Sequence, residues 1–205
     1  DVIVYDRLVS KEIIDLIPSG VAKIYVGKES GRHALPQHET NELLVNLAKG
    51  KEHRSIVRLK GGDPFMFGRG SEEALVLAEN NVNFEVVPGI TSAMACAAYA
   101  GVPLTHRGLA NGVCFIAGHR KADQTLELDQ SAIRDKDCTL AIYMGIGNLE
   151  PIVDAVLEAG RPIDTPVAVI EQGTTSQQRR LISDLSSLVS DTRDAGILPP
   201  AMIVI

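Results

Sequence analysis

Cysteine is scarce in this sequence, and its few copies are poorly placed for a disulfide framework or a zinc site. The 205 residues include three cysteines, Cys96, Cys114 and Cys138, which lie far apart and form no CxxC pair. A disulfide scaffold needs paired cysteines, and a zinc ribbon needs closely spaced ones. His106 and His119 are too isolated in the sequence to suggest metal ligation. We therefore expect no disulfide scaffold, no metal and a reducing, cytoplasmic setting.

Long apolar runs, a basic excess and the common nucleotide-binding signatures are also missing. No apolar run reaches the ~18 residues of a membrane-spanning helix, and no signal-peptide pattern is present. Twenty Lys and Arg against 26 Asp and Glu give a net charge of −6, which disfavours a protein that coats nucleic acid. There is no Walker A sequence, and residues 145–147 (GIG) lack the third glycine of a dinucleotide fingerprint. We expect neither a nucleic-acid partner nor a membrane partner.

What the sequence does contain is an alternation of short β-branched runs with longer helical patterns. This alternation is typical of an α/β protein with a largely parallel sheet. Strands are expected at residues 3–5, 23–26, 55–59, 84–87, 113–117, 139–144, 167–170 and 201–205. Helices are expected at residues 39–49, 71–80, 91–100, 149–159 and 184–194. The small apolar residues of 91–100 predict that this helix is deeply buried.

A polar, glycine-containing stretch, Arg107–Gly112, fits neither pattern and is the expected linker between two lobes. We therefore predict an N-terminal α/β lobe over residues 1–107 and a C-terminal α/β lobe over residues 108–205. The chain begins and ends in strand-like runs, so both lobes are expected to lack a segment at these ends.

Two glycine-containing motifs follow predicted strands. In RLKGGDP (58–64), paired glycines permit close approach of a ligand to the backbone, and the proline stiffens the turn. In VPGITS (87–92), hydroxyl groups and backbone N–H groups are expected at the start of a buried helix. Ligands of open α/β sheets bind at the carboxyl ends of strands, so both motifs are candidate binding loops. A plain tight turn and an ordinary helix N-cap are the alternatives.

Further candidates follow other strands. YMG (143–145) and EQGT (171–174) are each either ligand contacts or routine turns. Several cations also lie near strand ends, which suggests a polyanionic small ligand, although a solvated surface charge explains any single one of them. Asp6 and Lys28 directly follow the first two strands. They are either a catalytic base and acid or ordinary loop charges.

Together these segments resemble the uroporphyrinogen-III C-methyltransferases of the tetrapyrrole (class III) methylase family. The resemblance runs over nearly the whole chain, in a specific order and spacing. It includes VYDRLV (4–9), VGK (26–28), RLKGGDPFMFGRG (58–70), VPGITS (87–92), GVPLTHR (101–107), YMG (143–145) and EQGT (171–174). The longer segments favour these enzymes over a diphthine synthase or an rRNA methylase of the same fold.

The resemblance implies a fold and a set of site residues. Two α/β lobes of the tetrapyrrole methylase type are expected to bind S-adenosylmethionine in the cleft between them and to release S-adenosylhomocysteine. Asp6 matches the family's proton acceptor, and Lys28 matches its proton donor. The implied cofactor contacts are Gly61, Gly62, Asp63, Met66, Thr91, Ser92, Met144 and Gly173. The cations expected to hold substrate carboxylates are Arg7, Arg69, His106 and Arg107.

The implied reaction is two methyl transfers, to C2 and C7 of uroporphyrinogen III, giving precorrin-2 for sirohaem or cobalamin biosynthesis. A homodimer is expected. Three alternatives stay open: a methylase of a later corrin precursor, an inactive cofactor-binding module of a larger fusion, and a doubly wound dehydrogenase, which the incomplete glycine fingerprint disfavours. One departure from the family is that its glycine- and proline-rich loop, which touches the cofactor, has no counterpart before Asp1.

Overall fold

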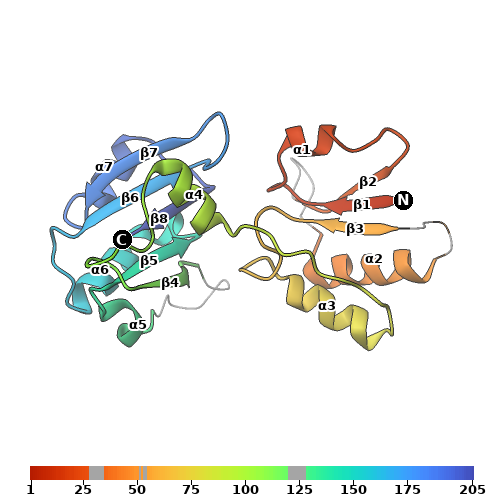
Figure 1. Ribbon diagram of the computed structural model, residues 1–205, viewed down its shortest axis with the longest axis horizontal. Coiled ribbons are helices and arrows are strands. Elements are labelled where there is room, and N and C mark those ends of the chain that lie inside the picture. The colour runs from red at the N-terminus through yellow and green to blue at the C-terminus, as the bar shows by residue number, and fades with distance from the viewer. Residues whose placement is uncertain (28–34, 51, 53–54, 120–127) are drawn as a thin grey trace. The chain divides into compact units, whose positions relative to one another are not determined.

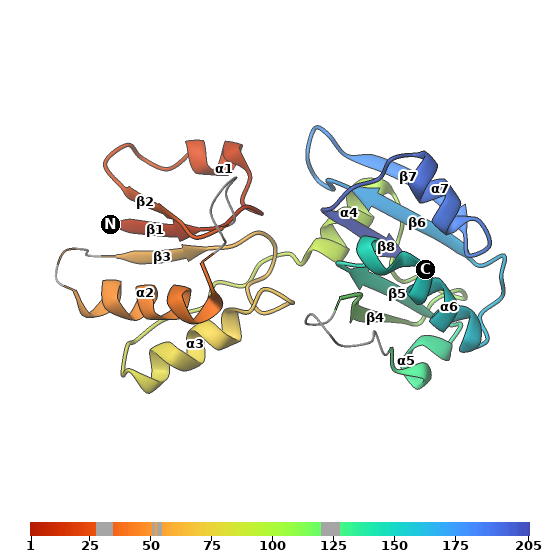
Figure 2. The ribbon, with the colours of Figure 1, turned by 180° about the vertical axis from the view of Figure 1, so that it is seen from behind.

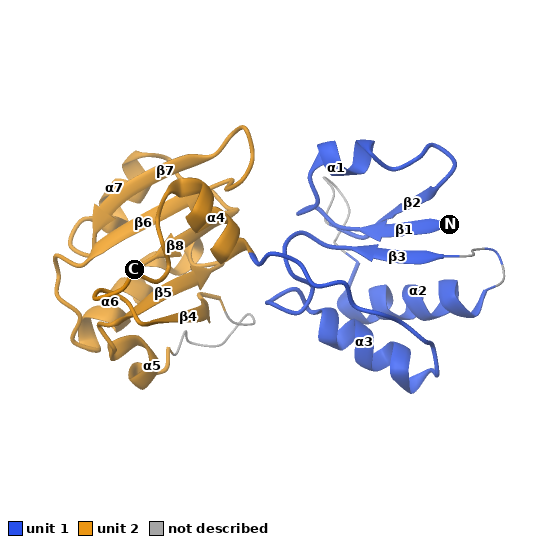
Figure 3. Cartoon of the chain, in the orientation of Figure 1, with its two compact units in different colours: residues 1–91 blue, residues 92–205 orange. Residues whose placement is uncertain are grey.

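The structure is a computed structural model that describes residues 1–27, 35–50, 52, 55–119 and 128–205 (Figure 1). The chain divides into two compact units, Asp1–Thr91 and Ser92–Ile205 (Figure 3). This division falls before the small-residue helix, whereas the sequence suggested a linker after Arg107. The domain limits of 1–107 and 108–205 stay a prediction.

The first unit is built on a three-stranded sheet with the order β2-β1-β3, in which both strand pairs are parallel. Its strands are β1 (Val2–Tyr5), β2 (Ala22–Tyr25) and β3 (Ile56–Leu59). Its helices are α1 (Lys11–Asp15), α2 (Gln37–Lys49) and α3 (Gly70–Glu79). Helix α2 lies against β3, and α3 lies beside α2 (Figures 1 and 2). Val4, Val26 and Leu44 are the buried centre of this unit, because the apolar stripe of α2 faces the strands.

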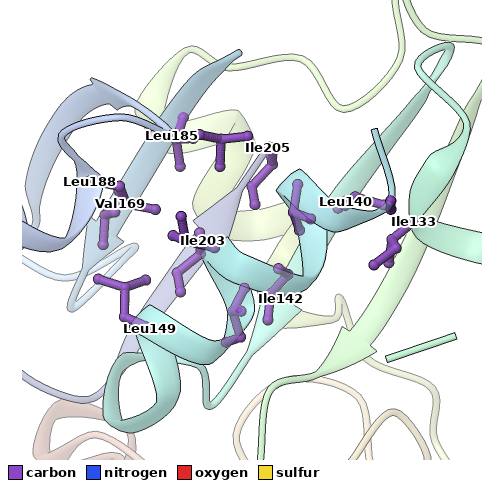
Figure 4. Close-up of a cluster of buried hydrophobic side chains, with 14 of the residues drawn as sticks. Ile133, Leu140, Ile142, Leu149, Val169, Leu185, Leu188, Ile203 and Ile205 are labelled. Carbon is purple, nitrogen blue, oxygen red and sulfur yellow. The ribbon is translucent and has the colours of Figure 1, made fainter. Parts of the chain in front are cut away.

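The second unit contains a five-stranded sheet with the order β4-β5-β8-β6-β7. Its strands are β4 (Gly112–Ala117), β5 (Cys138–Tyr143), β6 (Pro166–Glu171), β7 (Arg179–Asp184) and β8 (Ala201–Val204). Its helices are α4 (Ser92–Ala100), α5 (Gln130–Arg134), the 3₁₀ turn η1 (Ile146–Asn148), α6 (Leu149–Glu158) and α7 (Leu188–Asp194). The central strands and α6 enclose an aliphatic core that includes the fully buried Ile142 and Ile203 (Figure 4). Ile152 of α6 is fully buried in the same core.

Most predicted elements are present, but the expectation of a largely parallel sheet is wrong for the second unit. There only β4 and β5 pair in parallel, and β8 runs antiparallel to both of its neighbours, as β7 does to β6. A short connection between β6 and β7 requires an antiparallel pair. The sequence missed β7 because it opens with Arg179 and Arg180 and lies at the sheet edge, where polar residues remain exposed.

Three other expectations need correction. Residues 84–87 form no strand, and their side chains are exposed. The helix expected to begin at Asp184 begins at Leu188, because Asp184 ends β7 and its carboxylate accepts the N–H groups of Ser186 and Ser187. Helix α4 is buried along one face only, whereas Met94 and Tyr99 are exposed.

Among the described residues, no helix combines the length and the apolar composition needed to cross a membrane.

Candidate functional site

The candidate residues of the first unit gather at one edge of its sheet. Asp6 follows β1, and Gly61, Gly62 and Asp63 follow β3. Because β1 and β3 are parallel and paired in register from Val2 and Ile56 onward, their carboxyl ends lie at the same edge. Ligands of α/β sheets bind at this edge, so the placement supports a binding site. Lys28 lies outside the described residues.

The glycines after β3 are required by close contacts within the protein, apart from any contact with a ligand. A Cβ atom at Gly61 would lie 2.7 Å from the carbonyl oxygen of Leu8, and one at Gly89 would lie 2.3 Å from the carbonyl oxygen of Gly62. Gly62 itself has a φ of 72°, a left-handed conformation that favours glycine. The backbones of Gly61 and Gly62 nevertheless remain exposed, so a ligand can still approach them.

The side chain of Asp63 stabilises the loop after β3 by hydrogen bonds to backbone N–H groups. Its Oδ1 atom accepts the N–H groups of Phe65 (2.9 Å) and Met66 (3.1 Å), and its Oδ2 atom accepts that of Gly89 (3.0 Å). The bond from Gly89, followed by that from Phe65, lowers the pKa of the Asp63 carboxyl below its ordinary value of 3.8. One carboxylate therefore joins the GGDP turn to the segment before α4. A direct contact of Asp63 or Met66 with cofactor stays a prediction.

The depressed pKa of Asp63 predicts a pH-dependent contribution to stability. Since the folded protein holds the carboxylate as an anion, the contribution is complete above the ordinary value of 3.8 and is lost as the pH falls through the lower folded pKa. We expect Asp63→Asn to have a lower free energy of unfolding than the wild type at neutral pH, and the difference to shrink below about pH 4. Urea unfolding at several pH values measures it. A difference that is the same at pH 7 and pH 3 would contradict this role.

A buried network of charges lies beside Asp6. The Arg58 NH2 atom donates to Asp6 Oδ2 at 2.8 Å, and Arg58 Nε donates to Glu73 Oε1 at 3.2 Å. Glu73 is only 5% exposed and also accepts from Lys60 Nζ at 3.1 Å and from Gln37 Nε2 at 3.2 Å. Burial, followed by repulsion from Arg58, lowers the pKa of Lys60. Lys60 therefore points into the network and is not available to hold a substrate carboxylate.

The predicted substrate-binding cations differ in their surroundings. Arg7 is exposed directly after Asp6. Arg69, which has a φ of 59°, is also exposed and forms a bidentate ion pair with Glu72, with both N–O distances at 2.8 Å. His106 and Arg107 belong to the second unit and are exposed, and His106 Nδ1 lies 2.9 Å from the Arg107 carbonyl oxygen. Their exposure is compatible with anion binding, which stays a prediction for all four.

The candidate residues of the second unit also share one edge of its sheet. β5 and β6 are both antiparallel to β8, so they run in the same direction and their carboxyl ends lie together. Met144 follows β5 with a φ of 56° and is 52% exposed, and Gly173 closely follows β6. The Tyr143 hydroxyl accepts the N–H of Ala93 at 3.1 Å, which attaches the start of α4, at Ser92, to the end of β5. Thr91, just before α4, is buried.

Gly173 lies against helix α4. A Cβ atom at this position would come within 2.3 Å of Cys96 Sγ and 3.0 Å of Cys96 Cβ. The small residues of the buried face of α4, Ala93, Cys96, Ala97 and Ala100, allow this close approach. The structure therefore attaches α4 to the end of β5 through Ala93 and Tyr143, and to the loop after β6 through Cys96 and Gly173.

Sequence reasoning missed the partners of these residues. The sequence analysis assigned no role to Arg58, Glu73 or the Tyr143 hydroxyl. Arg58 nevertheless lies in β3, Lys60 comes directly after that strand, and Glu73 follows in the next helix. Two cations spaced two residues apart at the end of a strand point to the same side of the sheet, which is a readable signal for a buried counter-ion. As for metals, the described residues contain no group of three or more His, Cys, Asp or Glu side chains placed to hold an ion.

Comparison with known proteins identifies the family. The model of the Tetrapyrrole (Corrin/Porphyrin) Methylases matches residues 1–189. The chain belongs to this family. A siroheme synthase of Nitrosospira multiformis is 46% identical over all 205 residues, and this tetrapyrrole methylase chain covers 43% of that relative. The chain thus spans less than half the length of the curated relatives it matches.

Solved structures agree with this assignment. The uroporphyrin-III C-methyltransferase of Thermus thermophilus, complexed with S-adenosylhomocysteine, has a TM-score of 0.83 and 37% identity, covering 99% of this chain and 84% of that one. A cobalt precorrin-4 methyltransferase has a TM-score of 0.84 and 26% identity, covering 99% of this chain and 82% of that one. The mixed α/β fold predicted from the sequence, of the tetrapyrrole methylase type, is confirmed.

Proposed function

We propose that this chain is an S-adenosylmethionine-dependent C-methyltransferase that methylates uroporphyrinogen III at C2 and C7 to give precorrin-2. The observation that carries the proposal is the 37% identity and TM-score of 0.83 to a uroporphyrin-III C-methyltransferase over nearly the whole chain. The siroheme synthase relatives support a role in sirohaem formation, and cobalamin formation is a second possible destination of the product.

The residues at the two sheet edges fit an adenosyl cofactor. S-adenosylmethionine supplies a methyl group activated by its positively charged sulfur. In the first unit, the exposed backbones of Gly61 and Gly62 offer polar groups without an intervening Cβ. In the second unit, Met144 offers an exposed apolar side chain directly after Tyr143, whose hydroxyl accepts the N–H of Ala93 in α4. We propose these residues, with Asp63, Met66, Thr91, Ser92 and Gly173, as the cofactor-binding set.

The remaining work of the protein is to bind the tetrapyrrole and to handle charge. Methylation of a pyrrole carbon leaves positive charge on the ring system, and a proton must then leave. Asp6, at the carboxyl end of β1, is the proposed group that stabilises this charge and accepts the proton. Lys28 is the proposed proton donor. The groups proposed to hold the carboxylates of the substrate are Arg7, Arg69, His106 and Arg107. Guanidinium groups bind carboxylates through paired N–H donors, and a histidine ring N–H can donate to a carboxylate oxygen.

A homodimer in the cytoplasm is part of the same proposal. The support is the family resemblance, together with the exposed Met94 and Tyr99 on α4, which are suited to burial against a second copy.

Methyl transfer tests the proposal directly. The natural full-length protein is incubated with methyl-labelled S-adenosylmethionine and uroporphyrinogen III, and the tetrapyrrole is analysed by mass spectrometry. We expect two labelled methyl groups per tetrapyrrole, and none in a reaction without enzyme. Folded protein that binds cofactor but leaves uroporphyrinogen III unlabelled would contradict the proposal. Label found only with later corrin precursors would indicate a related methylase.

A further inference from the structure

Arg58 is held too firmly to act as a substrate-binding group. Besides its bonds to Asp6 and Glu73, its NH1 atom donates to the carbonyl oxygens of Leu59 at 2.8 Å and Val4 at 3.4 Å. Its side chain is 14% exposed. A guanidinium has five N–H donors, and four of those of Arg58 are directed at protein acceptors, so the side chain cannot offer a bidentate grip to a ligand carboxylate. Its bonds point to a role inside the protein.

That role concerns the orientation of Asp6. The Oδ2 atom of Asp6 accepts from Arg58, and its Oδ1 atom accepts the N–H of Leu8 at 3.0 Å. Both oxygens are therefore fixed, one by the strand next to β1 and the other by the turn that follows β1. The Asp6 side chain remains 26% exposed, so a reacting group can still reach it.

Glu73 makes this arrangement possible. Without Glu73, the cations of Arg58 and Lys60 would lie largely buried near each other, and Asp6 would be the only anion among the three remaining side chains of the cluster. The carboxylate of Glu73 contacts both cations and brings the cluster to two positive and two negative charges. Buried charges are stable only when they are paired and hydrogen-bonded. Gln37, from α2, donates a further hydrogen bond to Glu73.

We propose that Arg58, anchored by Glu73, is a positioning residue that fixes the carboxylate of Asp6 for methyl transfer. This inference rests on the proposed function, because it explains how the carboxylate of the same site is oriented. Arg58 contacts neither ring nor cofactor in this role. It sets the direction of the Asp6 oxygens, and a misplacement of about 1 Å at such a group can lower a rate by on the order of 100-fold.

A double-mutant cycle on the natural full-length protein tests the inference, with Arg58→Gln, Asp6→Asn and their combination. We expect Arg58→Gln to lower kcat by about 10- to 100-fold and to leave the cofactor Kd within about twofold. The double variant should be no more than about threefold slower than Asp6→Asn alone, because Arg58 acts through Asp6. Arg58→Lys keeps the positive charge but loses the planar guanidinium with its several N–H donors, and its kcat should lie between those of the wild type and Arg58→Gln. If Arg58→Gln fails to fold, Arg58→Lys takes its place in the cycle.

The matched control is Lys60→Gln, which removes the other cation on Glu73 without touching Asp6. It should lose stability but keep kcat within about threefold. Two results would overturn the inference and leave the proposed function intact. One is a double variant whose loss of kcat equals the product of the losses in Arg58→Gln and Asp6→Asn. The other is an Arg58→Gln variant with the kcat of the wild type. An equal loss of kcat in Lys60→Gln would do the same. A wild-type protein that methylates no tetrapyrrole would overturn the proposed function and this inference together.

Discussion

Replacing Arg161 with methionine should destabilise the second unit by about 3 kcal/mol or more, one of the largest effects expected of any single change in this chain. Arg161 is 6% exposed and follows α6. Its Nε atom donates to the carbonyl oxygen of Ile133 at 2.7 Å, and its NH2 atom donates to those of Asp135 at 2.6 Å and Cys138 at 2.7 Å. Methionine keeps most of the apolar stem but leaves all three acceptors without this donor.

The reason for the size of the effect is the position of these acceptors. Ile133 lies in the last turn of the short helix α5, where carbonyl groups have no partner within the helix, and Cys138 begins β5. A buried acceptor that loses its donor costs about 1–3 kcal/mol. Ile133 is buried and Cys138 is half-buried, so these two carbonyl groups account for most of the effect. Asp135 is exposed, and its carbonyl oxygen also accepts the N–H of Cys138 at 3.3 Å. Burial lowers the pKa of Arg161, which shows how far this charge is removed from water.

Hydrogen exchange over residues 130–143, together with urea unfolding, measures the prediction. Arg134→Met is the matched control, since Arg134 is an exposed arginine of the same region, and its change should stay within about 0.5 kcal/mol. An Arg161→Met variant that unfolds like the Arg134→Met variant would show that water or a shifted loop replaces these three bonds.

The parts of the fold that sequence reasoning found are those set by local patterns. Strands β1, β3 and β5 are short β-branched runs, and α2 carries an apolar stripe, so each is readable from its own residues. The segment 84–87 has the same apolar composition as a strand but forms none. Composition shows that a segment can pair, whereas pairing depends on what lies beside it in the fold.

The site illustrates the same limit. Three of the four motifs, RLKGGDP, YMG and EQGT, lie at the ends of strands β3, β5 and β6 as predicted, whereas VPGITS follows no strand. They could not show that Asp63 turns toward its own loop or that Lys60 turns toward Glu73. The bond between Asp6 and Arg58 joins residues 52 positions apart, and no local pattern encodes such a partner. The motif residues were therefore predictable, whereas the residues that orient them were not.

Gly173→Ala should weaken cofactor binding by about tenfold or more while the chain stays folded. The new Cβ would lie 2.3 Å from Cys96 Sγ, so either the loop after β6 or helix α4 must move. Ala93, at the start of that helix, is bonded to Tyr143, the last residue of β5, and Met144 follows directly. A shift of α4 therefore displaces two of the proposed cofactor contacts, Ser92 and Met144, in addition to the loop that carries Gly173.

Gly147→Ala is the matched control, because its Cβ meets nothing within 4 Å and Gly147 lies just beyond Met144 after the same strand. Calorimetric titration with S-adenosylhomocysteine measures both variants, and circular dichroism checks their folding. Adding Cys96→Ala to Gly173→Ala removes the Sγ contact and leaves the 3.0 Å approach to Cβ, so it should restore part of the affinity. Restoration would trace the loss to the packing of the loop on α4. A Gly173→Ala variant that binds as tightly as Gly147→Ala would remove Gly173 from the cofactor-binding set, because a contact this close cannot be absorbed without moving the residues around it.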